Sequence, residues 1–287
     1  MKSWLRAALD GLVHAVVSVL EFGRLGRFLK DQFVVDVMER TTVVTYGEAT
    51  LTFGVPNRLN RFRADTFASK APETLEWITG MPAGAVLWDV GANVGLYSCL
   101  AARSRGCRVF AFEPSVFNLE MLARNIFLNK VTDLVTIVPL ALAGGLGTNT
   151  LNMTTTEWGG ALSTFGEDYG FDGRPMDKVF AFAPIGLSMD QAAEILALPM
   201  PQYLKIDVDG IEHLVLSGGA KVLQQVDSVL IEINVAFPEQ AEQAHRYLTE
   251  ARLSLVDQRR GPTLTGDAFE AVFNQIWRRP TAGPGHE

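Results

Sequence analysis

The feature that most constrains the fold is a short apolar run that meets an acid, turns at glycine and leads into a helical segment. Residues 86–95 read Val-Leu-Trp-Asp-Val-Gly-Ala-Asn-Val-Gly, and helix-forming side chains follow from Leu96. A buried strand, a glycine turn and a helix start form the loop in which open α/β sheets bind nucleotide-like ligands. Gly91 and Gly95 allow the tight turn and let a ligand approach with no Cβ in the way. We therefore predict a ligand-binding turn that begins at Asp89.

A second acid lies at the distance that a ribose-binding carboxylate requires. Glu113 ends the next apolar run, residues 108–112, and lies 18 residues beyond Gly95. One helix and one strand must intervene in such a fold, which places the ribose-binding acid about 20 residues after the glycine turn. We predict that Glu113 accepts hydrogen bonds from both hydroxyls of a ribose.

The glycine turn lacks the features of a pyrophosphate site. The NAD fingerprint Gly-x-Gly-x-x-Gly needs a middle glycine so that the pyrophosphate can approach the backbone, and Asn93 stands at that position. The sequence also contains no P-loop. A ribose-binding acid without a pyrophosphate cradle favours S-adenosylmethionine as the cofactor. An NAD-dependent oxidoreductase is the alternative, and Asn93 argues against it.

Four ordered blocks of residues 41–277 resemble the FkbM family of methyltransferases. The blocks are Asp89-Val90-Gly91-Ala92-Asn93-Val94-Gly95; Phe112-Glu113-Pro114 with Asn118, Leu122, Asn125 and Asn129; Leu204-Lys205-Ile206-Asp207-Val208-Asp209-Gly210-Ile211-Glu212; and Val229-Leu230-Ile231-Glu232-Ile233. Asp209 stands where the family more often carries Glu, and the shorter acid reaches less far. The resemblance implies a class I methyltransferase fold that uses S-adenosylmethionine, usually on a hydroxyl oxygen.

Apolar runs and amphipathic segments alternate along most of the chain. They predict strands at 86–90, 108–112, 134–139, 202–207 and 228–233, and helices at 95–104, 115–128, 211–219 and 239–251. Such alternation indicates an α/β, Rossmann-like fold with a mostly parallel sheet and helices on both faces. Two final extended runs, 253–258 and 269–278, are expected to complete seven strands with an antiparallel pair.

We expect three divisions of the chain. Residues 1–80 form an extension of helices and a β-hairpin that turns at Gly47-Glu48, and a helix from Pro72 covers the cofactor site. Residues 81–278 form the methyltransferase core. The Pro- and Gly-containing tail, residues 279–287, is predicted to be disordered.

A long interruption divides the predicted core. Residues 144–187 are rich in Gly and Thr and carry six aromatic side chains. Loops of this length inside a compact domain are usually functional, and this one would lie over the carboxyl ends of the strands. We interpret residues 144–187 as an acceptor-binding lid built on a β-hairpin, with a packing insertion or dimer contact as the alternative.

Charge and cysteine content exclude several functional classes. The chain carries 25 basic and 32 acidic residues, a net charge of −7, without a basic block, so nucleic acid is not expected as a partner. Cys99 and Cys107 are too few for a disulfide framework and suit a reduced, cytoplasmic protein. Asp207, Glu232 and Asn234 resemble the metal site of catechol-type methyltransferases only loosely, so no bound metal is predicted.

The first 30 residues combine apolar and basic side chains. Residues 11–20 form an apolar run that is too short to span a bilayer, which takes about 20 residues. Arg24, Arg27 and Lys30 then alternate with Phe and Leu. We expect a helix that packs on its own domain or on the partner of a homodimer. Peripheral contact of residues 1–30 with an anionic membrane surface is the alternative.

The methyl-transfer chemistry is expected at the end of the fourth core strand. In-line displacement depends largely on positioning, and a hydroxyl acceptor also needs a base. Asp207 ends a buried run, where a charge is costly without a partner, so we expect it to bind the methionine amino group or to act as base. Asp209, Glu212 and His213 are further catalytic candidates. Their alternative roles are helix-dipole stabilisation for the acids and an exposed helix position for His213.

The predicted cofactor site combines the residues of the first three blocks with a small apolar pair for the adenine. It comprises Asp89, Gly91, Asn93, Gly95, Glu113, Asn118, Ala141, Leu142 and Asp207. The expected activity is S-adenosylmethionine-dependent O-methylation of a hydroxyl on a sugar, glycan, lipid-linked or secondary-metabolite acceptor. A non-catalytic module that binds the cofactor and interacts with other proteins is a further alternative.

Overall fold

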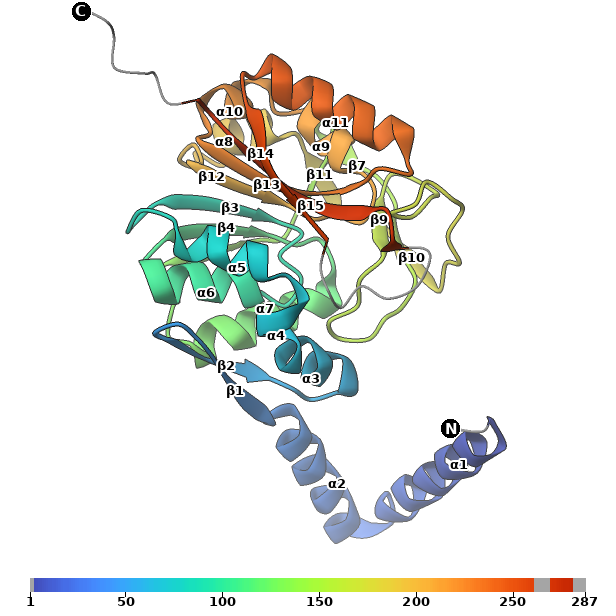
Figure 1. The fold of residues 1–287 in the computed structure, drawn as a ribbon. Helices are drawn as coiled ribbons and strands as arrows, with labels where there is room; N and C mark the ends of the chain where they lie inside the picture. Colours follow the sequence, from blue (N-terminus) through green and yellow to red (C-terminus); the bar gives the residue numbers. More distant parts are fainter. Residues whose placement is uncertain (1–2, 261–268, 281–287) are drawn as a thin grey trace, which may run out of the picture.

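A seven-stranded sheet forms the centre of the molecule (Figure 1). The computed structural model describes residues 3–260 and 269–280. The strands of the central sheet are β3 (Val86–Val90), β4 (Arg108–Phe112), β5 (Val135–Val138), β12 (Tyr203–Ile206), β13 (Ser228–Asn234), β14 (Ser254–Arg259) and β15 (Val272–Arg278). Their order is β14-β15-β13-β12-β3-β4-β5. Only β15 runs antiparallel to its neighbours, which confirms the α/β, Rossmann-like fold with a mostly parallel sheet.

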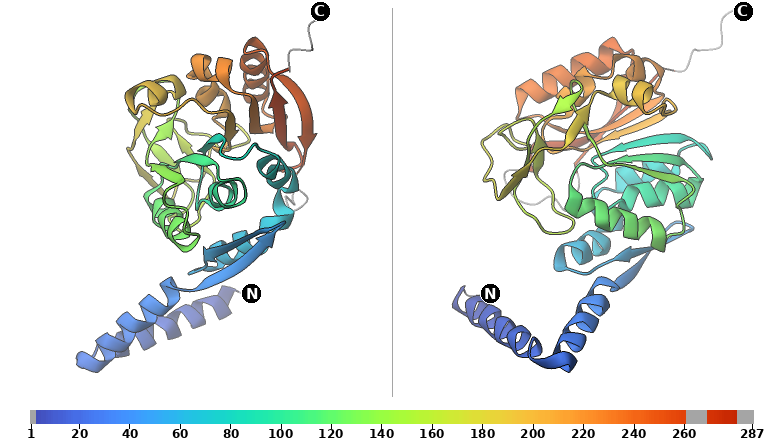
Figure 2. Two further views of the ribbon diagram at one scale, coloured as in Figure 1. Left: turned by 90° about the vertical axis from the view of Figure 1, so that its left-hand side faces the viewer. Right: turned by 180° about the vertical axis from the view of Figure 1, so that it is seen from behind.

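Helices cover both faces of this sheet (Figure 2). One face carries α5 (Pro72–Thr79), α6 (Leu96–Arg105) and α7 (Val116–Leu128), and the other carries α8 (Met189–Ile195), α9 (Glu212–Ser217), α10 (Ala220–Gln225) and α11 (Pro238–Glu250). Alternate side chains of one strand point to opposite faces, so Leu87 packs in the first apolar core and Trp88 in the second. The helix predicted over 211–219 is present as α9, and α10 is a further short helix that begins after Gly218 and Gly219.

The predicted β-hairpin is present and belongs to the main core. It consists of β1 (Thr41–Tyr46) and β2 (Ala49–Gly54), paired antiparallel around Gly47. Leu51 and Phe53 are buried with α5 and α6 in one apolar cluster. Because residues 41–80 share this core, we propose that the boundary of the extension lies near residue 40 rather than 80. Two short helices follow the hairpin, α3 (Arg58–Asp65) and α4 (Phe67–Lys70).

The first two helices project away from the rest of the molecule (Figures 1 and 2). They are α1 (Ser3–Leu20) and α2 (Gly23–Met38), which together we call the arm. They meet at a corner, and α2 has no buried residue. The expectation that this segment packs on its own domain is therefore wrong. No helix within residues 3–260 and 269–280 combines the length and apolarity needed to cross a membrane.

The interruption, residues 144–187, which we call the lid, contains more structure than one hairpin. Its strands are β7 (Gly147–Thr148), β8 (Leu151–Met153), β9 (Ser163–Phe165), β10 (Phe180–Phe182) and β11 (Ile185–Leu187). Strands β10, β8 and β9 form one small antiparallel sheet, and β11 joins β7 to β6 (Ala141–Leu142) in another. Residues 158–163, from the connection between β8 and β9 and the first residue of β9, lie at the carboxyl ends of β3 and β12, where they bind Asn93 and Asp209.

Arg279, the first residue of the predicted disordered tail, is held by hydrogen bonds. Arg279 donates from its guanidinium to the carbonyl oxygens of Leu223, Val226 and Ala251 at 2.7–3.1 Å. Arg279 therefore belongs to the core rather than to a disordered tail. The remainder of that prediction, residues 281–287, lies outside the described residues.

Candidate active site

Two adjoining cavities open at the carboxyl ends of β3, β4 and β12. The first has a volume of about 570 Å³ and the second about 490 Å³, each including its open mouth. The two cavities share Gly91, Asn93 and Asp207 as lining residues. A ligand that reached through both would pass Asp207 at the junction.

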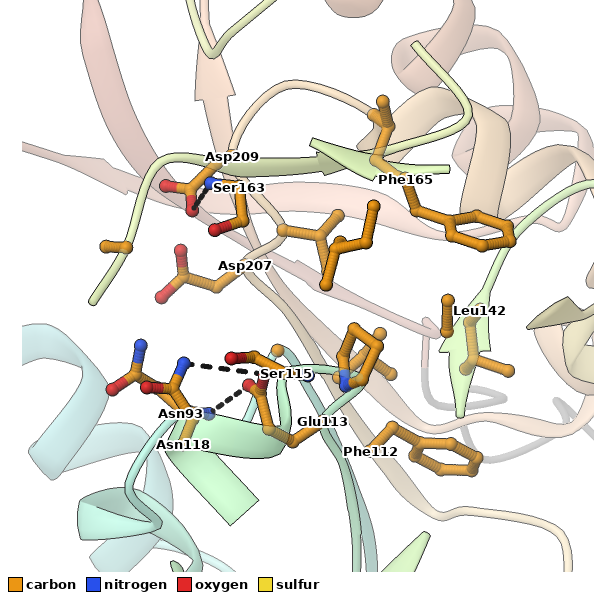
Figure 3. Close-up of a pocket in the computed structure, with 18 of the residues that line it drawn as sticks. Asn93, Phe112, Glu113, Ser115, Asn118, Leu142, Ser163, Phe165, Asp207 and Asp209 are labelled. Carbon is orange, nitrogen blue, oxygen red and sulfur yellow. Dashed lines mark hydrogen bonds between the residues drawn. The ribbon is translucent and has the colours of Figure 1, made fainter. Parts of the chain in front are cut away.

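Glu113 lies on the wall of the first cavity, buried and held by backbone groups (Figure 3). Its Oε1 accepts from the amide of Ser115 at 2.8 Å, and its Oε2 accepts from the amide of Asn93 at 2.8 Å. Burial raises the pKa of Glu113 to about 7, against these hydrogen bonds. A carboxylate oxygen can accept two hydrogen bonds, so Oε2 has capacity for a hydroxyl donor in the cavity.

The other end of the first cavity is apolar. Phe112 lines it from β4, Leu142 from β6, and Phe165 from β9 of the lid. Ala141 lines the same cavity, and the contact of Ala141 and Leu142 with an adenine stays a prediction. A polar acceptor near one end and apolar side chains near the other suit a ribose joined to a flat aromatic base.

A buried lysine joins the two acids at the ends of β3 and β12. Lys205 Nζ lies 3.3 Å from Asp89 Oδ1 and 3.3 Å from Asp207 Oδ2, and its side chain is 3% exposed. The strand register places Lys205 directly beside Asp89. Burial opposes ionisation of Asp207, but the charges of Lys205, Lys70 and Arg63 and the hydrogen bond from Lys205 together lower the pKa of Asp207. Asp89 lines neither cavity and accepts from Ser98 Oγ at 2.6 Å, so it contributes by holding Lys205.

The second cavity is bordered by cationic side chains that the sequence interpretation missed. Arg63 and Lys70, from α3 and α4, line it together with Phe67, Tyr97 and Lys205. In the described part of the chain, neither Arg63 nor Lys70 forms an ion pair with a carboxylate. Both lie close enough to Asp207 and Asp209 for their charges to interact with these acids at longer range.

Helices α3 and α4 border the site where the helix from Pro72, α5, was predicted. No residue of α5 lines either cavity. Instead Trp77 donates to Ser228 Oγ at 2.9 Å, and Glu73 accepts from Asn274 at 2.6 Å, which fixes α5 beside β13 and β15. The prediction that the helix from Pro72 covers the cofactor site is therefore wrong.

Two predicted cofactor-binding residues, Asn93 and Asn118, and the catalytic candidate Asp209 hold the lid in place. Asn118 accepts from the amide of Gly159 at 3.0 Å and donates to the carbonyl of Gly160 at 3.1 Å. Asn93 donates to the same carbonyl at 2.6 Å. Asp209 accepts from the amides of Leu162 and Ser163, as Figure 3 shows for Ser163. All three also line the first cavity, so the loop of residues 158–163 forms one of its walls.

The same loop is tied to α3. Asn57 and Asn60 both donate to the carbonyl of Trp158, at 3.0 and 2.8 Å. Arg63 Nε donates to the carbonyl of Gly159 at 2.8 Å, and the residue also lines the second cavity. The elements that precede the central sheet thus help to position the lid.

The two predicted glycines have different roles. Gly91 has φ of 78°, and a Cβ there would lie 1.9 Å from the backbone oxygen of Asp207. Gly91 therefore lets β3 end against the turn after β12. A Cβ at Gly95 would lie 2.3 Å from Leu122 Cδ1, so this glycine allows α6 to pack on α7 and lines neither cavity.

Two catalytic candidates lie outside both cavities. Glu212 accepts from the amides of Val208 and Gly210, each at 3.1 Å, and from Gln240, so it fixes the turn after β12. His213 is buried rather than exposed, with its ring 6.0 Å from that of Phe237, and neither of its ring nitrogens has a hydrogen-bond partner. Burial raises the pKa of Glu212 to about 7 and lowers the pKa of His213. We propose no catalytic role for either residue.

The residues considered for a metal are Asp207, Glu232 and Asn234. Asn234 donates to the carbonyl of Phe171 at 3.1 Å and so ties the lid to β13. Burial, with the charges of Asp207 and Asp209 adding to it, raises the pKa of Glu232. Among the residues the structure describes, no group of three or more His, Cys, Asp or Glu could hold a metal ion.

The chain is similar to known methyltransferases in sequence. Residues 89–260 match the model of the methyltransferase FkbM domain. The hexuronic acid methyltransferase AglP of Haloferax volcanii is 30% identical over 179 residues, which cover 59% of this chain and 63% of that protein. The match therefore spans less than two thirds of the relative's length.

Two solved methyltransferase structures are similar at low sequence identity. Precorrin-6y C5,15-methyltransferase from Geobacter metallireducens is 14% identical with a TM-score of 0.42, covering 73% of this chain and 87% of that one. M. jannaschii TYW2 in complex with AdoMet is 13% identical with a TM-score of 0.44, covering 84% and 87%.

Proposed function

Since the chain belongs to the FkbM methyltransferase family, we propose that it transfers a methyl group from S-adenosylmethionine to an oxygen atom of a sugar acceptor. The observation that carries this proposal is the pair of cavities joined at Asp207, with Glu113 on the wall of the first. One cavity offers an acceptor for ribose hydroxyls and apolar walls for a base. The other leaves space for a second substrate beside the first.

The residues present fit S-adenosylmethionine in chemical type. Glu113 would accept from the ribose, and Ala141 and Leu142 would contact the adenine. Asp207, which Lys205 keeps ionised, would hold the ammonium of the methionine end at the junction. When bound, the cofactor supplies a methyl group on a positively charged sulfur. The chain's own contribution is to hold the acceptor oxygen in line with that group.

Arg63 and Lys70 suggest that the acceptor is an acidic sugar. Their charges border the second cavity without a carboxylate partner in the described part of the chain. The guanidinium of an arginine pairs well with a carboxylate, and the relative AglP is a hexuronic acid methyltransferase. We therefore assign these two cations to a carboxylate of a sugar acid acceptor.

Binding of S-adenosylhomocysteine tests the cofactor assignment. Isothermal titration should give micromolar affinity for S-adenosylhomocysteine and none for NAD. Glu113→Ala should weaken the binding by about tenfold to a hundredfold, since a charged acceptor contributes roughly 1.5–3 kcal/mol. Glu120→Ala is the matched control, because Glu120 pairs with Arg124 on the exposed side of α7. Unchanged affinity in folded Glu113→Ala would refute the ribose role, and binding of NAD alone would overturn the function.

Steady-state kinetics tests the acceptor assignment. With saccharides that contain a hexuronic acid, Arg63→Gln and Lys70→Gln should raise KM for the acceptor and leave the affinity for S-adenosylhomocysteine unchanged. Arg61→Gln, on the exposed side of the same helix, is the control. If these variants instead lost affinity for the cofactor and kept the same KM for the acceptor, Arg63 and Lys70 would be assigned to the carboxylate of the cofactor.

A further inference from the structure

The first helix of the arm carries a continuous apolar face that is open to solvent. Its apolar residues recur at intervals of three and four, the spacing of one helix face. They are Leu5, Leu9, Leu12, Val16 and Val19. Leu12 is 60% exposed and Val19 is 69% exposed. Asp10, His14 and Ser18, each four residues apart, mark the opposite side. The helix is therefore amphipathic, and nothing in the described part of the chain covers its apolar face.

This apolar face is too wide for a single partner helix. Trp4 and Val13 flank it on either side and are 66% and 60% exposed, so apolar side chains occupy about half of the circumference. A two-stranded coiled coil buries a narrower stripe, at two positions in every seven. A broad face of this kind suits a continuous apolar medium rather than one helix of a second copy.

The second helix adds a basic side to the arm. In its first half, Leu25, Phe28 and Leu29 occupy one sector of the helix, and Arg24 and Arg27 occupy the adjacent sector. The apolar members are 48–71% exposed. Helices with Phe and Leu on one face and Lys or Arg on the other lie in the interface of a membrane. Both helices of the arm thus present unpaired apolar surface, and α2 supplies cations next to it.

Charge distribution identifies the kind of surface that fits. Residues 1–30 contain five Lys or Arg and two Asp or Glu, a net charge of +3, whereas the remainder contains twenty and thirty, a net charge of −10. An anionic surface would attract the arm and repel the rest of the molecule. Association of two copies would instead bring two acidic bodies together.

We propose that the arm docks the protein on an anionic lipid surface. The apolar sides of α1 and α2 enter the boundary between headgroups and acyl chains, and Arg24 and Arg27 face the headgroups. The acidic body, which contains both cavities, stays in the aqueous phase. This proposal rests on the arm alone and does not depend on the proposed methyl transfer.

Vesicle flotation of the full-length protein tests the proposal. The protein should float with vesicles of equal parts phosphatidylcholine and phosphatidylglycerol, should float less with phosphatidylcholine alone, and should be released by high salt. Light scattering after gel filtration should give the mass of a monomer. Failure to float with the anionic vesicles would overturn the proposal. A dimer that dissociates when the apolar face is altered would assign that face to a second copy.

Variants of the arm separate the apolar and the charged contributions. Leu12→Gln with Val16→Gln should lower vesicle binding by about tenfold or more, because two apolar side chains no longer leave water. Ser18→Gln, on the polar side of α1, is the matched control and should bind as the wild type does. Arg24→Gln with Arg27→Gln should lower binding to anionic vesicles by about fivefold for each charge. The binding of S-adenosylhomocysteine reports that the body is intact, and equal vesicle binding by all variants would contradict the proposal.

Discussion

The loop of residues 158–163 and the arm both extend from the central core, yet one is fixed and the other is free. The loop has few apolar side chains, and side chains of other segments bind its backbone. These partners are Asn57, Asn60, Arg63, Asn93, Asn118 and Asp209. The arm is far more apolar, but α2 buries no residue.

This difference shows that apolar content alone does not attach a segment to a core. A backbone group that is taken out of water needs a partner, and leaving it unpaired costs roughly 1–3 kcal/mol. In the loop, asparagine and aspartate side chains satisfy the amides and carbonyls that no strand can pair. The arm satisfies its own backbone within its helices, so it needs no such partners and stands apart.

The largest loss of stability is expected at Lys205, which pairs with two acids of the site. Lys205→Met leaves Asp89 and Asp207 without their buried cation, which should lower the free energy of unfolding by about 3–5 kcal/mol. Chemical denaturation should measure this loss, and Lys221→Met at an exposed position is the control. Unchanged stability would show that the two acids do not depend on Lys205.

Removal of one loop partner should detach the loop without affecting the arm. Asn118→Leu removes the acceptor of the Gly159 amide and a donor to Gly160, so exchange of the loop amides should speed up by about tenfold. Hydrogen-exchange mass spectrometry should detect this change in residues 158–163, with the arm peptides as an internal reference. Equal exchange of the loop before and after the substitution would mean that Asn118 does not hold it.

The pH dependence of stability should carry a contribution from Asp209. Burial, to which the charge of Asp207 adds, raises the pKa of Asp209 to about 6 in the folded protein, so folding takes up a proton. The stability from this group is complete below its unfolded pKa, about 3.9, and is lost as the pH rises through about 6. Asp209→Asn should therefore flatten the fall in unfolding free energy between about pH 4 and 6. If the unfolding free energy fell equally with pH in the wild type and in Asp209→Asn, Asp209 would not contribute to this pH dependence. Glu113 and Glu212 titrate in both proteins and so do not distinguish them.

The smallest effect is expected at the arm. Deletion of residues 1–38 should leave the thermal unfolding midpoint of the body within about 1 °C, because regions without tertiary contacts add little to global stability. Calorimetry of the shortened and full chains makes the comparison. A large decrease in the midpoint would show that the arm stabilises the core after all.

Most of the fold could be predicted from local sequence patterns. The strands at 86–90 and 108–112 begin and end where their apolar runs do, and the hairpin turns at its glycine. Helix α3 was missed because Arg58–Asp65 is mostly polar and shows little apolar periodicity. It forms because Asn57 caps its first turn through the amide of Asn60. Capping of this kind depends on a single side chain and leaves only a weak trace in the sequence.

The site was predicted less completely than the fold. Glu113 could be found because its spacing from the glycine turn is fixed by one helix and one strand. Asn93 and Asn118 were recognised, but their loop partners lie 67 and about 40 residues away, so their roles depend on tertiary structure. Lys205 did leave a signal: a charge inside a buried strand needs a partner, and the strand register supplies Asp89.

The origin of the loop's partners has a consequence for the order of folding. Some of these partners precede the loop in the sequence and others follow it. Asn57 lies 101 residues before its partner Trp158, and Asp209 lies 47 residues after its partner Leu162. Contacts between distant residues form late, since the intervening chain must first be ordered. During synthesis the loop leaves the ribosome before Asp209 does, so a chain that stops short of β12 has no complete first cavity. Assembly of the cavity wall therefore depends on β12 reaching its place in the sheet, and it does not require β13, β14 or β15, which follow later in the chain.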